Sequence, residues 1–208
     1  GDIIHQKDIL FRLKGRVHNI LSSERTLLNM IQHASGIATN VKNFVNELEG
    51  LNVKLLDTRK TRPNLRVFEK YATRVGGATN HRMGLDDALM IKDTHLKTFN
   101  IPLSAFISIA KQKIPFTSQI EVECETLEMA KDAMESDVDI VMCDNMDKEE
   151  IKKVVDFRNQ YHKKILIEAS GNITKENIRE YALCGVDAIS SGSLIHQATW
   201  LDFSMKIE

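Results

Sequence analysis

The sequence lacks the features that would set it apart from an ordinary globular protein. Its 208 residues include only 3 prolines, 3 cysteines and 1 tryptophan. No apolar run approaches the roughly 18 residues of a membrane-spanning helix. Nothing in the composition indicates disorder or low complexity. We therefore expect one good-sized globular domain, or one domain with a small appendage, and no membrane association.

Cysteine is too scarce and too scattered to form a disulfide framework or a zinc knuckle. Cys124, Cys143 and Cys184 are odd in number and widely spaced, which favours a reducing cytoplasm. We expect no signal peptide at the start of the chain. The chain begins at Gly1 without an initiator Met, which indicates a fragment or a processed form.

An excess of one charge is also absent. The chain has 28 Lys+Arg and 29 Asp+Glu, giving a net charge of −1. This balance argues against a general nucleic-acid or membrane-surface role. Residues 57–95 nevertheless concentrate cations next to short apolar runs, which predicts a pocket for a multiply anionic small molecule. These cations are Arg59, Lys60, Arg62, Arg66, Lys70, Arg74, Arg82 and Lys92.

Short apolar runs, rich in β-branched residues, recur along the chain and end in polar residues. Their lack of alternation is typical of strands buried on both faces. Helical segments separate them, so the strands should be parallel. Polar residues end nearly every run, which favours a TIM-like parallel α/β barrel, closed or nearly closed, over a doubly wound sheet. The runs are 53–56, 88–91, 120–122, 140–143, 165–167 and 188–189.

Several helix ends are also predicted. Thr126 or Leu127 begins one helix, Asp147 is placed to cap another, and Thr174 is placed to cap a third, which Gly185 closes. A helix earlier in the chain carries three cations at i, i+4 and i+8, which we interpret as a solvated face: Arg66, Lys70 and Arg74.

The two ends of the chain differ from the predicted barrel. Residues 1–15 and 201–208 alternate like strands, and we expect them to pair in a small, incomplete α+β sheet. Residues 16–50 are predicted to be helical, with a break at Ser35-Gly36. The expected organisation is an N-terminal sheet and helix region, a barrel, and a C-terminal segment that returns to the sheet: residues 1–50, 51–195 and 196–208.

Arg59 and Lys60 directly follow the first predicted barrel strand, and Thr58 adds a hydroxyl. An arginine fork matches a carboxylate or phosphate, and a lysine supplies a compact charge. We favour a site over a solvated charge pair, because further candidates follow in equivalent places: His81, Arg82 and Lys92. For His81 itself, a structural role stays open beside a functional one.

Glu123 and Asp144 end neighbouring strands. Two such carboxylates suit Mg²⁺ that keeps water and substrate ligands, or they suit ribose hydroxyls. Glu123 also alternates with Glu121 and Glu125, which predicts that all three point the same way. Acids inside a barrel need cations beside them, and two are available: Lys60 and Lys92.

Small residues with free backbone N–H groups follow the last two strands and predict a phosphate cradle, with ordinary turns as the alternative. These residues are Ser170, Gly171, Asn172, Ser191, Gly192 and Ser193, with His196 just beyond them. Arg25 reads locally as a surface charge.

Together these motifs resemble the quinolinate phosphoribosyltransferase family, the carboxylating nicotinate-nucleotide pyrophosphorylases. The resemblance runs from Gly1 to Glu208 and implies a member that is truncated at its N-terminus. Asn172 stands where the family often has a glycine, and asparagine tolerates a left-handed backbone. The motifs are Glu24-Arg25-Thr26, Ser35–Thr39, Asp57–Thr61, Asn80–Leu85, Ile91–Asp93, Glu121–Glu123, Asp144–Met146 and Glu168–Gly171.

The resemblance implies an α/β-barrel enzyme of NAD synthesis that joins quinolinate to phosphoribosyl pyrophosphate, using Mg²⁺, in dimers or assemblies of dimers. It implies that the quinolinate carboxylates are held by Arg59, His81 and Arg82, with Arg25 from the neighbouring subunit. It places Lys60, Lys92, Glu123 and Asp144 around the ribose, pyrophosphate and metal. It places the 5′-phosphate on Ser170, Gly171 and Gly192, with His196 nearby.

Two other functions stay open at this point. The first is a phosphoribosyltransferase for another anionic heterocycle, such as nicotinate. The second is a non-catalytic fragment that binds a phosphate ligand. Three arginines favour a dicarboxylate over a monocarboxylate: Arg25, Arg59 and Arg82. No residue is assigned as a general base.

Overall fold

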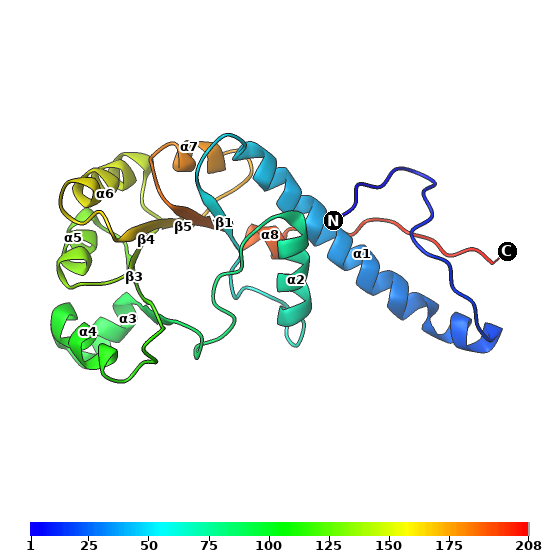
Figure 1. The fold of residues 1–208 in the computed structure, drawn as a ribbon, viewed down its shortest axis with the longest axis horizontal. Coiled ribbons are helices and arrows are strands. Elements are labelled where there is room, and N and C mark those ends of the chain that lie inside the picture. Colours follow the sequence, from blue (N-terminus) through cyan, green and yellow to red (C-terminus); the bar gives the residue numbers. More distant parts are fainter. Residues whose placement is uncertain (208) are drawn as a thin grey trace.

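The computed structural model describes residues 1–207, apart from the side chain of Asp93. Six short parallel strands form one sheet at its centre (Figure 1). Their order in the sheet is β1-β6-β5-β4-β3-β2. The strands are β1 (Lys54–Leu56), β2 (Leu89–Ile91), β3 (Ile120–Cys124), β4 (Ile140–Asp144), β5 (Leu166–Ser170) and β6 (Ala188–Ser190). Each of the six predicted apolar runs therefore overlaps a strand.

The sheet curls into a barrel that stays open along one seam. The first and last strands are neighbours, with Lys54 paired to Ala188. On its other side β1 meets Thr79, which forms an isolated parallel bridge with Leu56. In residues 1–207 no pairing joins Thr79 to β2. The prediction of a parallel, nearly closed α/β barrel is confirmed.

Helices cover the outside of the sheet (Figure 1). Isoleucines on β2, β3, β5 and β6 are almost completely buried between the layers, and each contributes roughly 1.5–3 kcal/mol through burial. The helices are α1 (Val17–Glu47), α2 (Arg66–Gly76), α3 (Asp93–Phe99), α4 (Leu103–Lys111), α5 (Leu127–Glu135), α6 (Lys148–Tyr161), α7 (Ile178–Ala182) and α8 (Ser193–His196). None of them, including the 31-residue α1, combines the length and apolar character that a bilayer crossing requires.

The predicted helix start at Thr126 or Leu127 and the predicted cap at Asp147 are both confirmed. The Thr126 side chain accepts a hydrogen bond from Met129 N, and the Asp147 side chain accepts one from Glu150 N. The cap predicted at Thr174 is wrong, because α7 begins only at Ile178. A side-chain oxygen of the intervening Asn177 accepts from Thr174 N at 2.8 Å instead.

Helix α1 runs without the predicted break at Ser35-Gly36. The glycine serves close packing rather than a change of direction. A Cβ atom at Gly36 would overlap the carbonyl group of Thr199 in the C-terminal segment. This close approach lets the C-terminal segment lie against the helix.

The small terminal sheet is absent from the described residues, so the strands predicted in 1–15 and 201–208 are wrong over residues 1–207. A two-stranded ribbon is marginal by itself. The C-terminal segment instead bonds to α1, where Leu201 N donates to Gln32 O and the Gln32 side chain donates to Phe203 O. Figure 1 shows both terminal segments as irregular chain beside α1.

Candidate active site

The carboxyl ends of the parallel strands bring most of the predicted residues to one rim of the barrel. Residues 58–60 follow β1, Lys92 follows β2, and Asp144 ends β4. The predicted phosphate residues follow β5 and β6. Arg25 is the exception, because it is exposed on α1. Its predicted role in a neighbouring subunit stays a prediction.

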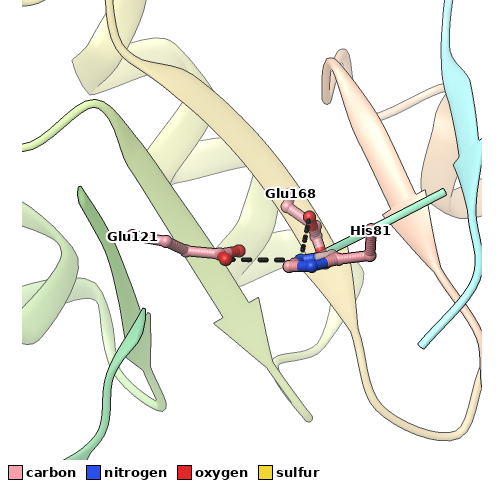
Figure 2. A group of neighbouring side chains, drawn as sticks. All are labelled: His81, Glu121 and Glu168. Atoms are coloured by element: carbon pink, nitrogen blue, oxygen red, sulfur yellow. Dashed lines mark ion pairs between the residues drawn. The ribbon is translucent and has the colours of Figure 1, made fainter. Parts of the chain in front are cut away.

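His81 lies between two buried glutamates inside the barrel (Figure 2). Its Nε2 is 3.3 Å from Oε2 of Glu121 on β3 and 3.5 Å from Oε2 of Glu168 on β5. The two glutamates are only 3% and 2% exposed. Sequence analysis identified Glu121 only as one of three alternating acids, and it assigned no role to Glu168. The contact joins two strands and a loop, so no local pattern could have predicted it.

The pKa of His81 reflects two opposing effects. Burial disfavours the charged ring, but hydrogen bonds and Coulomb attraction from Glu121 and Glu168 outweigh it and raise the pKa to about 10. Arg82 N also lies 2.8 Å from Nδ1 of His81. Nδ1 can accept a hydrogen bond from this N–H only if the ring is neutral. Two ion pairs outweigh one main-chain hydrogen bond, so we assign the cation at neutral pH.

This ion cluster makes stability depend on pH. The folded pKa of His81, about 10, lies above the ordinary value of 6.5. Its contribution to stability is therefore complete below pH 6.5 and is lost as the pH rises towards 10. We expect the unfolding free energy of the parent to fall more steeply across this range than that of His81→Gln. Urea unfolding at several pH values measures both, and equal slopes would contradict the cationic ring.

The same three side chains have the composition of a metal site but do not fit one. One ligand atom from each of His81, Glu121 and Glu168 lies within 4.8 Å of the others. However, Nε2 carries a proton whether the ring is cationic or accepts from Arg82 N–H through Nδ1. A histidine binds a metal through an unprotonated nitrogen. The cluster is therefore an ion-pair site.

The alternating acids of β3 do not share one environment. Glu121 meets His81, whereas Glu123 forms an ion pair with Lys92. Glu125 lies beyond the strand and is exposed. The prediction that all three point the same way is wrong at Glu125, because the strand ends before it. Lys92 meets Glu123 as predicted, whereas the cation beside Glu121 is His81 and not the predicted Lys60.

Arg82 is buried in the rim with part of its hydrogen-bonding capacity unused. It is 8% exposed, and its Nη1 donates to Ala88 O at 2.8 Å. Nη2 contacts only the Met90 sulfur, and Nε is without a partner among residues 1–207. Burial lowers the pKa of Arg82, and so does repulsion by Arg59. Because a guanidinium stays charged in proteins, this end of the barrel has two neighbouring cations and spare donors.

Asp57, the last residue before the Thr58–Lys60 segment, organises both cationic loops. It is fully buried. Its carboxylate accepts hydrogen bonds from the Lys70 ammonium, from Thr73 Oγ1 at 2.7 Å, and from the Asn80 side chain. It also accepts from His81 N at 2.9 Å. One carboxylate therefore ties β1 and α2 to the loop that carries His81 and Arg82.

The predicted solvated face of α2 is wrong at Lys70, which is only 1% exposed. Lys70 and Thr73, which are three residues apart on α2, both face the buried carboxylate of Asp57 instead of solvent. Arg74 is exposed as predicted.

The loop after β5 offers unpaired main-chain donors. Gly171 and Asn172 both have left-handed backbones, with φ of 95° and 51°, so the expected tolerance of Asn172 is confirmed. A Cβ atom at Gly171 would lie 2.6 Å from Asn145 N. In the described chain, the N–H groups of Gly171 and Asn172 make no backbone hydrogen bond. Two adjacent N–H groups that are free in this way suit an anion.

The loop after β6 supplies backbone donors, but its hydroxyls are already engaged. Ser191 Oγ donates to Ile173 O at 2.8 Å and lies 2.6 Å from Ser193 Oγ. Gly192 packs closely enough that an added Cβ would lie 2.8 Å from Lys60 Cδ and 3.2 Å from His196 Nε2. The fold thus brings Lys60 and His196 together at this turn, as the predicted site requires.

The structure is a parallel α/β barrel whose C-terminal rim carries cations and free main-chain donors. These features are typical of α/β-barrel proteins that bind anions. The chain belongs to the quinolinate phosphoribosyl transferase family. Residues 37–206 match the model of that family's C-terminal domain, and residues 1–35 match that of its N-terminal domain. The resemblance identified in the sequence is confirmed.

Named relatives agree with this assignment. The chain is 40% identical over 207 residues to a probable nicotinate-nucleotide pyrophosphorylase (carboxylating) from Synechocystis, covering 100% of this chain and 70% of that protein. A protein of the same name from Bacillus subtilis is also 40% identical, with the same coverage. NadC from Streptococcus pyogenes is 44% identical with a TM-score of 0.85, over 92% of this chain and 66% of that one. The chain thus spans about two thirds of that solved relative.

Proposed function

We propose that the chain transfers the phosphoribosyl group of phosphoribosyl pyrophosphate to quinolinate. The products are nicotinate mononucleotide, pyrophosphate and CO₂, in de novo NAD synthesis. The observation that carries this proposal is the buried Arg82, which has an unpartnered Nε beside the second cation Arg59. A guanidinium fork matches a carboxylate. Two carboxylates on one pyridine ring suit two neighbouring arginines better than a monocarboxylate does.

The loops after β5 and β6, next to the Arg59–Lys60 segment that follows β1, suit the phosphoribosyl donor. The free N–H groups after β5 and the turn at Gly192 suit its 5′-phosphate. Lys60 passes over Gly192 and has no ion-pair partner in the described chain. Lys92 is held by Glu123. These contacts support a role for both ammonium groups in binding the pyrophosphate.

The charges of the rim suit the bond changes of this reaction. When the bond from the anomeric carbon to pyrophosphate breaks, negative charge develops on the leaving group and positive charge on the ribose. Lys60 and Lys92 would stabilise the first, and Glu123 or Asp144 the second. Arg59 and Arg82 would hold the pyridine nitrogen towards the anomeric carbon. The C2–carboxylate bond then breaks to release CO₂. Its electron pair stays on C2 beside the pyridinium nitrogen, and C2 takes up a proton from water.

The carboxylates at the ends of β3 and β4 also suit Mg²⁺. In the described chain, Glu123 Oε1 and Asp144 Oδ1 have no hydrogen-bond partner, while their other oxygens meet Lys92 and Asn145. Mg²⁺ usually combines one or two carboxylates with water and substrate oxygens, so the donor set fits. Glu123 and Asp144 would hold the ion, which would supply charge neutralisation to the departing pyrophosphate.

Oligomeric state and location complete the proposal. The exposed position of Arg25 on α1 supports a role in the site of a neighbouring subunit. All three cysteines are free, which supports a reducing cytoplasm. No nucleic acid or membrane partner is proposed, in keeping with the net charge of −1.

Turnover tests the function directly. The chain, quinolinate labelled in its 2-carboxylate, phosphoribosyl pyrophosphate and Mg²⁺ should yield labelled CO₂ and nicotinate mononucleotide in equal amounts. A parallel reaction with nicotinate should give far less nucleotide. If nucleotide forms with nicotinate but not with quinolinate, the substrate is the other heterocycle, nicotinate. Binding of the donor without release of pyrophosphate would indicate a non-catalytic protein.

A further inference from the structure

The loop that carries His81 and Arg82 crosses the open seam of the barrel. It joins Thr79, the bridge residue beside β1, to β2, and residues 80–88 contain no regular secondary structure. A strand in this position would be held by backbone hydrogen bonds to its neighbours. This loop has none to β2 or β3, so side chains must fix its position.

Three buried carboxylates hold the loop from different strands. Asp57 after β1 binds the His81 main chain and the Asn80 side chain. Glu121 on β3 and Glu168 on β5 bind Nε2 of the His81 ring (Figure 2). The loop is therefore fixed at its start and across the barrel interior, one residue before Arg82.

The two glutamates are unusual as purely structural groups. Their Oε1 atoms are buried without a hydrogen-bond partner among residues 1–207. Burying carboxylates carries a desolvation penalty, and well-packed apolar residues often give equal or better stability. Stability alone therefore does not account for two acids at this point. The contacts of the two glutamates explain their presence better, because both carboxylates meet the same nitrogen of the His81 ring, Nε2.

The ring in turn determines where Arg82 lies. Arg82 N is 2.8 Å from His81 Nδ1, and the Arg82 side chain is itself buried. A rotation of the imidazole would displace the following main chain and, with it, the guanidinium. An error of about 1 Å in a binding group can reduce a rate by roughly a hundredfold.

We propose that Glu121 and Glu168 are positioning residues for the dicarboxylate substrate, because they fix the His81 ring and thereby orient Arg82. This inference rests on the proposed function for the identity of the ligand. Neither glutamate touches the substrate in this arrangement. They act through His81, at the one part of the barrel wall that lacks strand pairing.

The test uses substitutions that keep the shape of the glutamates. In Glu168→Met and Glu121→Met, the KM for quinolinate should rise roughly tenfold or more. The KM for phosphoribosyl pyrophosphate should change less than about twofold, and the melting temperature should change little, because His81 keeps one glutamate partner. Glu168→Gln keeps an oxygen acceptor for Nε2–H, so its KM for quinolinate should stay nearer the parent value. Glu125→Met, an exposed acid just past β3, is the matched control and should behave as the parent.

A readout without substrate separates this proposal from the proposed function. With ¹⁵N-labelled histidine, the His81 Nε2–H proton should be protected from exchange in the parent and exposed in Glu168→Met. An unchanged quinolinate KM in both methionine variants would overturn the proposal. So would a joint rise of both KM values with a lower melting temperature. The proton could be protected in the parent and exposed in Glu168→Met while the parent shows no turnover. That result would overturn the proposed function, and with it the ligand named here.

Discussion

Replacing Asp57 with alanine should lower the free energy of unfolding by about 3–5 kcal/mol. The reason is that Lys70, which is 1% exposed, would be left as a buried charge without its partner. The same change removes the acceptor for Thr73, Asn80 and His81 N. Urea unfolding of parent and variant measures the difference.

A double variant sharpens this prediction. Asp57→Ala combined with Lys70→Met leaves neither charge buried alone, so it should be more stable than the sum of the single changes indicates. The exposed ion pair of Lys111 and Asp137 is the control. Asp137 has a left-handed backbone, which asparagine tolerates, so Asp137→Asn should alter stability by less than about 1 kcal/mol. Strict additivity of the two changes would show that the buried pair is not coupled.

Replacing Arg82 with alanine should weaken quinolinate binding by roughly 2–5 kcal/mol, which is about 30-fold or more in the dissociation constant. The guanidinium is buried and its unpartnered Nε is available to a carboxylate, so its loss removes charge and geometry together. Affinity for phosphoribosyl pyrophosphate should change little. Calorimetry with each ligand in turn measures both constants.

Arg82→Lys is the informative companion variant. Lysine keeps the charge but loses the planar fork, so its affinity for quinolinate should fall between those of the parent and Arg82→Ala. Because Arg82 also bonds to Ala88 O, the melting temperature of each variant must be measured. Unchanged quinolinate affinity in Arg82→Ala would remove Arg82 from the site.

The barrel could be predicted because each of its strands carries its own signal. Ile140–Cys143 is a continuous apolar run, and its burial on both faces follows from that pattern alone. Caps such as Thr126 and Asp147 act within three residues, so their effect is also visible locally. Polar residues at strand ends then predicted the position of the site.

What the sequence did not reveal depends on contacts between distant segments. Lys70 reads as a surface charge until Asp57 is known to lie beside it, 13 residues earlier in the chain. Glu168 acquires a role only when β5 places it next to His81. The alternating pattern of residues 1–15 predicted a strand, but a strand also needs a partner, and pattern does not supply one. In each case the missing information was the identity of the neighbour.

The pairing of β1 with β6 has a consequence for how the chain folds. These are the first and last strands of the barrel, and nearly all of its sequence lies between Lys54 and Ala188. Closing so long a loop costs entropy that is recovered only after the pairing forms, and such non-local pairing slows folding. During synthesis, Lys60 therefore leaves the ribosome long before Gly192, the residue against which it packs. The cationic and phosphate-binding halves of the rim can meet only when the last strand has been made.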